Sequence, residues 1–431
     1  MDAFRITGGN PLKGSVSASG SKNASLPLFA ACLLTEEESI LENVPELSDV
    51  GFMADIIRGL GAEVEKIGQN TWRIKPQTIS HYAPYELVRK MRASICLLGP
   101  LAARLGKADV PMPGGCVIGN RPIDLHVRGL VALGANVELK NGIVRVKCPS
   151  LHGSSIFMGG RHGSTVTGTA NVIMAACLAK GKTTLDGAAC EPEIQDLCNM
   201  LIKMGANIQG LGSHRLIIEG VNELKGCKHK VIPDRIETAT YAIAAGMTHG
   251  SIEILGCNPE HLGAFASVMQ GCGMELSTND SGNLLAKVSS EGLKPFEVIT
   301  LPYPGFPTDL QAQTMALACV IPGLSILTER VYPSRFMHVP ELLRMGAKIS
   351  LEGSSAVVVG GEKLHGAPVM ASDLRASAAL ILAGLAAQDE TWVQRIYHLD
   401  RGYDRFEQKL QLLGANVERL PANSISSKCL A

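Results

Sequence analysis

The sequence lacks an excess of charge of either sign and contains few aromatic side chains. It has 40 basic and 40 acidic residues, so its formal net charge is zero, and aromatic residues make up 4% of the chain. A general binder of nucleic acids or membrane surfaces needs a net basic field or a platform of aromatic rings. We therefore expect no nucleic acid and no membrane among its partners, and any anion site must be built locally.

Long apolar runs are also missing. The two longest, ASLPLFAACLL (24–34) and ASAALILAGLAA (376–387), span eleven and twelve residues, whereas about 20 are needed to cross a bilayer. The first residues, MDAFRITGGNPLKG, lack the basic region and apolar core that mark a signal peptide. We therefore expect a cytoplasmic protein.

Recognisable metal motifs are absent from the sequence. None of the 12 cysteines forms a CxxC pair, and neither an HExxH motif nor an acidic calcium loop occurs. Because such motifs bring metal ligands together, we expect no metal site. Most cysteines, among them Cys32, Cys96, Cys177 and Cys319, lie in apolar surroundings and are expected to be buried free thiols.

Cys116 has a different setting. It lies in PMPGGCVIGNRPIDLH (111–126), where proline and glycine recur too often for a regular helix or strand. Loops on a rigid scaffold often carry the chemistry of an enzyme. The segment therefore predicts a loop with a candidate reactive thiol.

Glycine is abundant, and six glycines mark an internal repeat. Each follows a stretch with helical spacing and precedes alternating runs such as NVELKNGIVRVK or KISLEGSSAVVV. They lie 68 to 73 residues apart, at Gly61, Gly134, Gly205, Gly273, Gly346 and Gly414. A glycine after a helix fits a left-handed C-terminal residue, and alternation fits a hairpin with one buried face. The pattern predicts six α/β units.

The repeat also predicts two lobes. A chain of 431 residues exceeds the size of a single hydrophobic core. A solenoid would need polar caps at its ends, which the sequence does not contain. We expect three units per lobe, with a boundary near KVIPDRIET (230–238) and a ligand cleft between the lobes.

Cationic side chains recur beside glycine- or serine-rich segments of both predicted lobes. They are Lys22, Arg92, Arg121, Arg335, Arg375 and Arg401. Each alone fits an ordinary surface or ion-paired residue, but six in such contexts favour an anion site. Asp309 and Asp373 accompany them. Asp309 is either the N-cap of the following helix or a free carboxylate, if Thr308 caps that helix instead.

These segments together resemble the UDP-N-acetylglucosamine 1-carboxyvinyltransferase family of enolpyruvyl transferases. The resemblance covers nearly the whole chain, up to about residue 420. Its motifs, in chain order, are FRITGGNPLKGSVSASGSKNASLP, YELVRKMRASICLLGPLAARLG, PGGCVIGNRPIDLH, EPEIQDLCNML, PDRIET, FPTDLQAQ, SRFMHVPELLRMGA, DLRASAALILAGLA and YHLDRGYDRFEQKLQLLGA.

The resemblance implies a two-lobed, inside-out α/β barrel. Each lobe would hold three βαβαββ repeats around buried helices, with the active site in the interdomain cleft. One lobe would span residues 22–232 and carry the cysteine lid loop at 111–122. The second, formed by 1–21 and 233–431, would carry the catalytic aspartate.

The resemblance further implies the reaction. The enolpyruvyl group of phosphoenolpyruvate would pass to the 3-hydroxyl of UDP-N-acetylglucosamine by addition and elimination, with loss of phosphate, as the first committed step of peptidoglycan synthesis. A carbon–oxygen bond breaks, so no metal and no organic cofactor are expected. A covalent phosphoenolpyruvate adduct on Cys116 is possible in this family.

Residue roles follow from the same resemblance. Lys22, Cys116, Asp309 and Arg401 would be catalytic, with Asp309 as the base for the sugar hydroxyl. Lys22, Arg121 and Arg401 would clamp phosphoenolpyruvate, assisted by Arg335 and Arg375, with Asp373 beside them. The UDP-sugar site would be lined by Asn23, Arg92, Arg121, Pro122, Ile123, Asp124, Leu125, Ser164, Thr165, Val166, Thr167, Asp309 and Val331.

Cys116 has two roles open to it. Nearby arginines favour the thiolate, which suits a nucleophile, whereas proton donation to the methylene carbon of phosphoenolpyruvate needs the thiol. The resemblance implies that fosfomycin alkylates this residue. Two departures from the family pattern are Ala170, where glutamate is frequent, and Ser21, where alanine is common.

Two alternative functions stay open. The shikimate-pathway enolpyruvyl transferases share the implied fold, although Cys116 and the RPIDLH run argue against them. A catalytically silent, UDP-sugar-binding paralogue is the other, although Lys22, Cys116, Asp309 and Arg401 are all present. The sequence does not identify protein partners or the oligomeric state.

Overall fold

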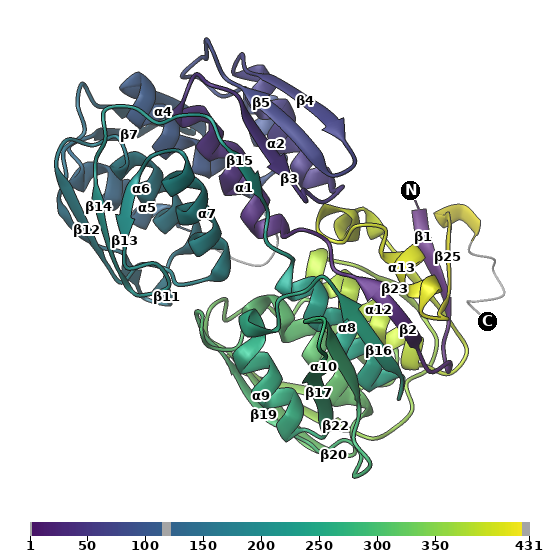
Figure 1. The fold of residues 1–431 in the computed structure, drawn as a ribbon. Coiled ribbons are helices and arrows are strands. Elements are labelled where there is room, and N and C mark those ends of the chain that lie inside the picture. Colours follow the sequence, from purple (N-terminus) through teal and green to yellow (C-terminus); the bar gives the residue numbers. More distant parts are fainter. Residues whose placement is uncertain (1, 114–121, 425–431) are drawn as a thin grey trace. The chain divides into compact units, whose positions relative to one another are not determined.

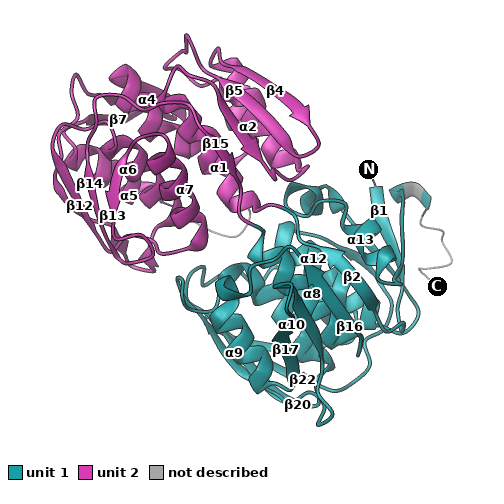
Figure 2. Ribbon diagram, in the orientation of Figure 1, with its two compact units in different colours: residues 1–19, 117–119, 233–431 teal, residues 20–116, 120–232 magenta. Residues whose placement is uncertain are grey.

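The structure, a computed structural model, describes residues 2–113 and 122–424. These divide into two compact units, coloured separately in Figure 2. Unit 1 comprises the described residues of 1–19 and 233–424, and unit 2 comprises those of 20–232. The lobes expected from sequence had bounds at 22 and 232, close to these limits; their assignment as independent domains stays a prediction.

Unit 2 contains three main sheets and a small two-stranded one, with strand orders β15-β3-β5-β4, β6-β8-β7, β13-β14-β12-β9 and β10-β11. Its elements are α1 (Lys22–Ala31), η1 (Cys32–Leu34), β3 (Ser39–Glu42), α2 (Ser48–Gly59), β4 (Glu63–Gly68), β5 (Thr71–Lys75), α3 (Tyr85–Val88), η2 (Arg92–Leu97), α4 (Leu98–Leu105), β6 (Lys107–Pro111), α5 (Asp124–Ala132), β7 (Asn136–Lys140), β8 (Ile143–Lys147), β9 (Ser155–Phe157), β10 (Gly159–Gly160), β11 (Gly163–Ser164), α6 (Val166–Ala176), β12 (Lys182–Asp186), α7 (Pro192–Lys203), β13 (Asn207–Gln209), β14 (Arg215–Glu219) and β15 (Lys228–Lys230).

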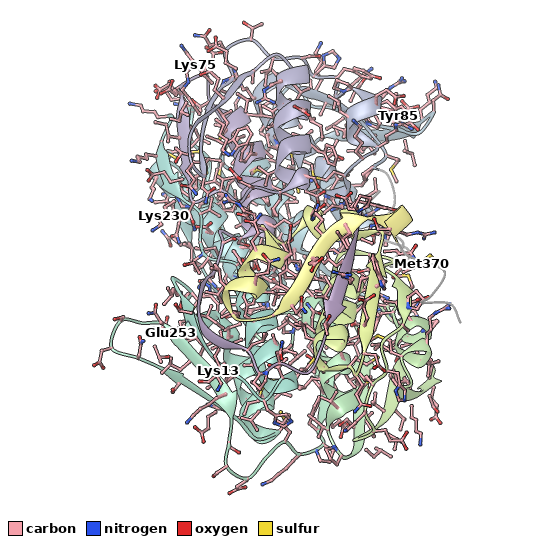
Figure 3. The ribbon with its side chains drawn as sticks, turned by 90° about the vertical axis from the view of Figure 1, so that its right-hand side faces the viewer. Lys13, Lys75, Tyr85, Lys230, Glu253 and Met370 are labelled. Atoms are coloured by element: carbon pink, nitrogen blue, oxygen red, sulfur yellow. The ribbon has the colours of Figure 1, made fainter. Side chains whose placement is uncertain are left out.

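Unit 1 contains three four-stranded sheets, ordered β17-β18-β16-β2, β19-β20-β22-β21 and β23-β24-β1-β25. Its elements are β1 (Asp2–Thr7), β2 (Lys13–Ser17), α8 (Arg235–Met247), β16 (Ser251–Leu255), η3 (Pro259–Leu262), α9 (Gly263–Gly271), β17 (Met274–Thr278), β18 (Leu284–Val288), β19 (Glu297–Thr300), η4 (Thr308–Leu310), α10 (Gln311–Val320), β20 (Gly323–Glu329), α11 (Val339–Arg344), β21 (Lys348–Glu352), β22 (Ser355–Gly360), β23 (Pro368–Met370), α12 (Leu374–Ala386), β24 (Glu390–Gln394), η5 (Ile396–Arg401), α13 (Phe406–Leu412), β25 (Asn416–Pro421) and η6 (Ala422–Ser424). Figure 3 labels Lys13 on β2, Glu253 on β16 and Met370 on β23.

The six-fold repeat predicted from glycine is confirmed. Each repeat glycine follows an outer helix (α2, α5, α7, α9, α11 or α13) and precedes a strand. All six glycines have positive φ, namely Gly61 at 108°, Gly134 at 94°, Gly205 at 105°, Gly273 at 95°, Gly346 at 89° and Gly414 at 92°. This backbone conformation is unfavourable for residues with a Cβ atom, which explains why glycine recurs there.

Alternating runs form the predicted hairpins. In NVELKNGIVRVK, β7 and β8 pair antiparallel, and Asn141 and Gly142 turn the chain with φ values of 53° and 72°. This is the two-residue turn that matches the twist of paired strands. In KISLEGSSAVVV, β21 pairs with β22 in the same way.

The amino-terminal strand completes the sixth repeat. The strand β1, which contains AFRIT, pairs antiparallel with both β24 and β25, near the other end of the chain. The next strand, β2, pairs parallel with β16 of the fourth repeat. Unit 1 is therefore assembled from two separate segments of the chain.

Each unit encloses helices within its sheets. In unit 1, α8, α10 and α12 contact one another and the strands of their own sheets (Figure 1). Every residue from Ile236 to Met247 of α8 is buried, and many of these side chains are small. A helix buried on all sides needs such a composition rather than one apolar stripe. The two hydrophobic cores have no residue in common.

The structure supports the predicted setting of the cysteines. Cys32, Cys96, Cys177 and Cys319 are buried free thiols. Burial raises the pKa of Cys96 and Cys319 to about 12, so both stay uncharged. Within residues 2–113 and 122–424, no helix is long and apolar enough to span a membrane. The same residues contain no group of three or more His, Cys, Asp or Glu side chains that could hold a metal ion.

Candidate active site

Asp309 lies at the centre of a charged cluster in unit 1, where its side chain is half-buried. It is the middle residue of η4, directly before the buried helix α10. Arg335 Nη1 lies 2.8 Å from Asp309 Oδ1, and Arg375 Nη2 lies 3.0 Å from Asp309 Oδ2. Each carboxylate oxygen therefore has its own guanidinium partner, and both arginines are buried.

This arrangement answers the question left open for Asp309. Neither Thr308 nor Asp309 caps the helix, because η4 and α10 both begin without a side-chain cap. The expectation that Asp309 is either a cap or a free carboxylate is therefore wrong. The Asp309 carboxylate pairs instead with two arginines, which lie 26 and 66 positions away in the sequence. Local helix propensity cannot predict such distant contacts.

Electrostatics keep Asp309 ionised. Burial alone would raise the pKa of its carboxyl, but the charges of Arg375 and Arg335 outweigh burial and hold the pKa well below its usual value. Arg375 also stacks its guanidinium over the Tyr403 ring, 5.3 Å from the centroid. Its Nε and Nη1 atoms have no hydrogen-bond partner among the described residues, so they are available to another acceptor.

Asp373 helps to place Arg375. It is the N-cap of α12, and its carboxylate accepts hydrogen bonds from the backbone N–H groups of Arg375 and Ala376 at 2.9 and 3.2 Å. The buried His338 lies in the same electrostatic environment. Burial lowers its pKa to about 4; Asp373 opposes this effect and Arg335 adds to it.

Arg401 ends η5 in the same unit. Burial and the neighbouring Arg401 charge lower the pKa of His398, whereas Asp373 raises it. Arg401 and Asp373 both influence the pKa of His398, and Asp373 and Arg335 both influence that of His338. Because Asp373 also caps the helix that carries Arg375, unit 1 brings Arg335, Asp373, Arg375 and Arg401 into one electrostatic region.

Glu329 is a site residue that sequence reasoning missed. This fully buried carboxylate at the end of β20 accepts 2.8 Å hydrogen bonds at Oε1 from the N–H groups of Val331 and Tyr332. Its Oε2 accepts from Thr308 Oγ1 at 2.8 Å, and Thr308 Oγ1 accepts from Arg335 Nη1 at 3.1 Å. Glu329 therefore ties the Val331 turn to Arg335. The local sequence Thr-Glu-Arg (328–330) contains no motif that would predict these contacts of Glu329.

In unit 2, Lys22 and Asn23 are the first two residues of α1. Ser21, one of the two departures from the family pattern, caps this helix by accepting a hydrogen bond from Ala24 N at 3.3 Å. Lys22 Nζ lies 2.9 Å from Asp49 Oδ2, so the lysine has an acidic neighbour.

A second group of predicted residues surrounds His126 in unit 2. Arg92 opens η2, Asp124 opens α5, and both influence the pKa of this histidine. Thr167, on the first turn of α6, lies 3.2 Å from His126 Nε2. Thr165 caps α6 by accepting from Gly168 N at 3.2 Å. The predicted nucleotide residues of three segments therefore meet here.

The remaining predicted residues have simpler surroundings. Pro122 is exposed, Ile123 is half-buried and Leu125 packs into the core. Ala170, the other departure from the family pattern, is fully buried inside α6. Cys116 and Arg121 lie outside the described residues, so their predicted roles stay predictions.

The sequence is similar to enolpyruvyl transferases over nearly its whole length. A family model described as EPSP synthase (3-phosphoshikimate 1-carboxyvinyltransferase) matches residues 6–410. The chain is 52% identical over 421 residues to the UDP-N-acetylglucosamine 1-carboxyvinyltransferase of Methylacidiphilum infernorum, covering 97% of this chain and 99% of the relative. It is 49% identical over 422 residues to the protein of the same name from Akkermansia muciniphila, covering 98% and 99%.

Solved structures share the fold. The enolpyruvyl transferase NikO from Streptomyces tendae superposes with a TM-score of 0.88 at 24% identity, covering 98% of this chain and 99% of that one. An EPSP synthase from Acinetobacter baumannii gives a TM-score of 0.74 at 16% identity, covering 98% and 100%. At these identities the likeness shows the fold alone.

Proposed function

Because this chain belongs to the UDP-N-acetylglucosamine 1-carboxyvinyltransferase family of enolpyruvyl transferases, we propose that it makes the first committed intermediate of peptidoglycan synthesis. It transfers the enolpyruvyl group of phosphoenolpyruvate to the 3-hydroxyl of UDP-N-acetylglucosamine and releases phosphate. The observation that carries the proposal is the half-buried Asp309 carboxylate, paired with the buried Arg335 and Arg375 within 3.0 Å.

The arginines supply charge for the anionic substrate. Phosphoenolpyruvate carries a carboxylate and a phosphate, and planar guanidinium groups bind both in bidentate fashion. Arg375 supports this role, because two of its nitrogen atoms have no hydrogen-bond partner in the described part of the chain. Lys22, Arg121 and Arg401 complete the proposed clamp.

Asp309 acts as the base for the sugar hydroxyl. Its low pKa makes it a weak base while both arginines pair with it. When Arg335 and Arg375 also bind the substrate anion, their positive charge is divided between that anion and Asp309. The pKa of Asp309 then rises, and the carboxylate becomes a stronger base. The hydroxyl oxygen then adds to C2 of phosphoenolpyruvate while a proton is added at C3, giving a tetrahedral intermediate.

Elimination completes the reaction. A proton leaves C3, the bond from C2 to the phosphate oxygen breaks, and phosphate departs. The chemistry balances without a metal or an organic cofactor. We propose Cys116 as the residue that moves the C3 proton or forms the covalent adduct, and fosfomycin as its alkylating inhibitor.

The nucleotide occupies the amino-terminal end of α6. Backbone N–H groups of a first helical turn favour phosphate, and Thr165 to Thr167 lie at this turn. The buried Ser164 hydroxyl oxygen has no hydrogen-bond partner among the described residues, which supports a ligand there. We propose a cytoplasmic location.

Release of phosphate tests the proposed function. We expect release only when phosphoenolpyruvate and UDP-N-acetylglucosamine are both present, and loss of release after fosfomycin treatment. Release with shikimate 3-phosphate in place of the UDP-sugar would identify the shikimate-pathway activity. Binding of the UDP-sugar without release would identify a silent paralogue.

Cysteine variants locate the inhibitor. We expect Cys116→Ala to abolish turnover and Cys116→Asp to retain activity while resisting fosfomycin, because a carboxyl group can move a proton but is not alkylated as a thiol is. Cys227→Ala is the matched control, since this partly exposed thiol in unit 2 has no proposed role. Full activity of Cys116→Ala would remove Cys116 from the mechanism.

A further inference from the structure

Asn171, on the buried helix α6, has its side-chain amide oriented by two backbone groups. The N–H of Gly99 donates to Asn171 Oδ1 at 2.7 Å, and Asn171 Nδ2 donates to the carbonyl oxygen of Ile95 at 2.8 Å. A backbone N–H only donates and a carbonyl oxygen only accepts. The two partners therefore determine which side-chain atom is oxygen and which is nitrogen.

This orientation determines the tautomer of His126. Asn171 Nδ2 also lies 2.8 Å from His126 Nδ1, and its second N–H has to donate there. Nδ1 is then an acceptor, so the proton of a neutral imidazole is on Nε2. Burial, with the charge of Arg92, lowers the pKa of His126 to about 4, and Asp124 opposes this only in part. The ring is therefore neutral at pH 7.

The tautomer in turn orients a hydroxyl group. His126 Nε2 lies 3.2 Å from Thr167 Oγ1 and donates to it, so the hydroxyl hydrogen of Thr167 has to point elsewhere. Within the described part of the chain this hydroxyl makes no other hydrogen bond in its half-buried position. The opposite tautomer would turn the hydrogen back to the ring and present only lone pairs to a ligand.

We propose that His126, protonated at Nε2 and held by Asn171, is a positioning residue that presents the Thr167 hydroxyl as a hydrogen-bond donor to the nucleotide phosphates. This inference rests on the proposed function, which places the UDP group at the start of α6. It adds a chain of three side chains, Asn171, His126 and Thr167, of which only Thr167 was predicted to line the site.

Nitrogen-15 spectroscopy of the ligand-free protein tests the tautomer. The full chain is labelled at its histidine nitrogens, and the signal lost in His126→Asn assigns His126. We expect one protonated nitrogen, Nε2, and one unprotonated nitrogen, Nδ1, with no change between pH 5.5 and 8. Protonation at Nδ1, or at both nitrogens at pH 7, would overturn the inference even if the enzyme turns over as proposed.

Calorimetric titration with UDP-N-acetylglucosamine tests the hydroxyl. Thr167→Val keeps the shape but removes the donor, and we expect roughly tenfold weaker binding, as for one hydrogen bond to a charged group. Thr167→Ser keeps the hydroxyl and should bind more tightly than Thr167→Val. Thr184→Val is the matched control, because this half-buried threonine on β12 lies outside the chain of three residues.

The outcomes separate the inference from the proposed function. Equal affinity of Thr167→Val and the Thr184→Val control would overturn the donor role of Thr167. Absence of binding to the unaltered protein would instead overturn the proposed function. The tautomer measurement needs no ligand and decides the orientation of His126 in either case.

Discussion

At the scale of single residues, charge pairing decides what Asp309 can do. One carboxylate is shared by two buried guanidinium groups, and two charges so close in a buried setting depend on each other strongly. The same arginines are the proposed ligands of phosphoenolpyruvate. Under the proposed function, the basicity of Asp309 would depend on whether the substrate anion is present. Thr308 links Arg335 to Glu329 by hydrogen bonds.

Arg375→Gln tests this dependence. We expect turnover to fall on the order of a hundredfold, because one buried donor to the reacting anion is lost. The pKa of Asp309 should rise toward its usual value, since Arg375 lowers it in the unaltered protein. The acidic limb of kcat/KM against pH, measured by phosphate release, should therefore move to higher pH.

The exposed Arg344 provides a matched control for this variant. Among the described residues it pairs only with Glu341, one helical turn away, and such a surface pair contributes little. Arg344→Gln should leave turnover and the pH profile unchanged. If Arg375→Gln lowers turnover without moving the acidic limb, Asp309 is not the titrating base.

At the scale of elements, a buried ion pair joins α8, α13 and the segment after β2. Lys409 Nζ lies 2.6 Å from Glu237 Oε1 and 2.6 Å from Ser19 Oγ, and Ser19 N donates to Glu237 Oε2 at 2.7 Å. Burial raises the pKa of Glu237, and the charge of Lys409 opposes this rise. Removing the lysine would leave an uncompensated carboxylate in the core of unit 1.

Lys409→Met tests the ion pair. We expect unit 1 to lose about 3 kcal/mol of its free energy of unfolding, because an unpaired buried charge remains. The double variant Glu237→Gln with Lys409→Met should regain part of this loss, since a neutral amide can still accept from Ser19. Urea unfolding of Lys409→Met, of Glu237→Gln alone and of the double variant measures the coupling, and additive losses would show that the pair contributes nothing specific.

At the scale of the whole molecule, the two units differ in how the chain builds them. The described residues of unit 2 all come from 20–232, and among them the buried core runs from Ala24 to Val231. The core of unit 1 needs Phe4, Ile6, Leu12 and Val16 from the amino terminus. Phe4 and Ile6 lie on β1 and Val16 lies on β2, strands that complete two of its three sheets, and Leu12 directly precedes β2.

Excised fragments test this difference. We expect a fragment of residues 20–232 to unfold cooperatively in urea, because it retains its whole core. A fragment of 233–431 should not, because two sheets lose β1 and β2. The control is the 233–431 fragment with residues 1–19 joined to it through a flexible linker. Cooperative unfolding of the 233–431 fragment without residues 1–19 would contradict the role given to β1 and β2.

The sequence by itself determined the repeat, because a left-handed backbone after each outer helix requires glycine wherever it occurs in the chain. It also determined the hairpins, because the alternation of apolar and polar residues and the turn residues are local features. It determined the family as well, because the motifs cover nearly the whole chain. Composition likewise predicted the burial of most cysteines.

The tertiary structure alone decided which distant residues meet. The pairing of β1 with β25, the two arginines on Asp309 and the hydrogen bond from Thr308 to Glu329 join residues 21 to 419 positions apart. The tautomer of His126 depends on backbone groups of another segment. Such contacts follow from how the repeats pack, which no local pattern of residue types specifies. Charge placement and proton position therefore became visible only in the folded chain.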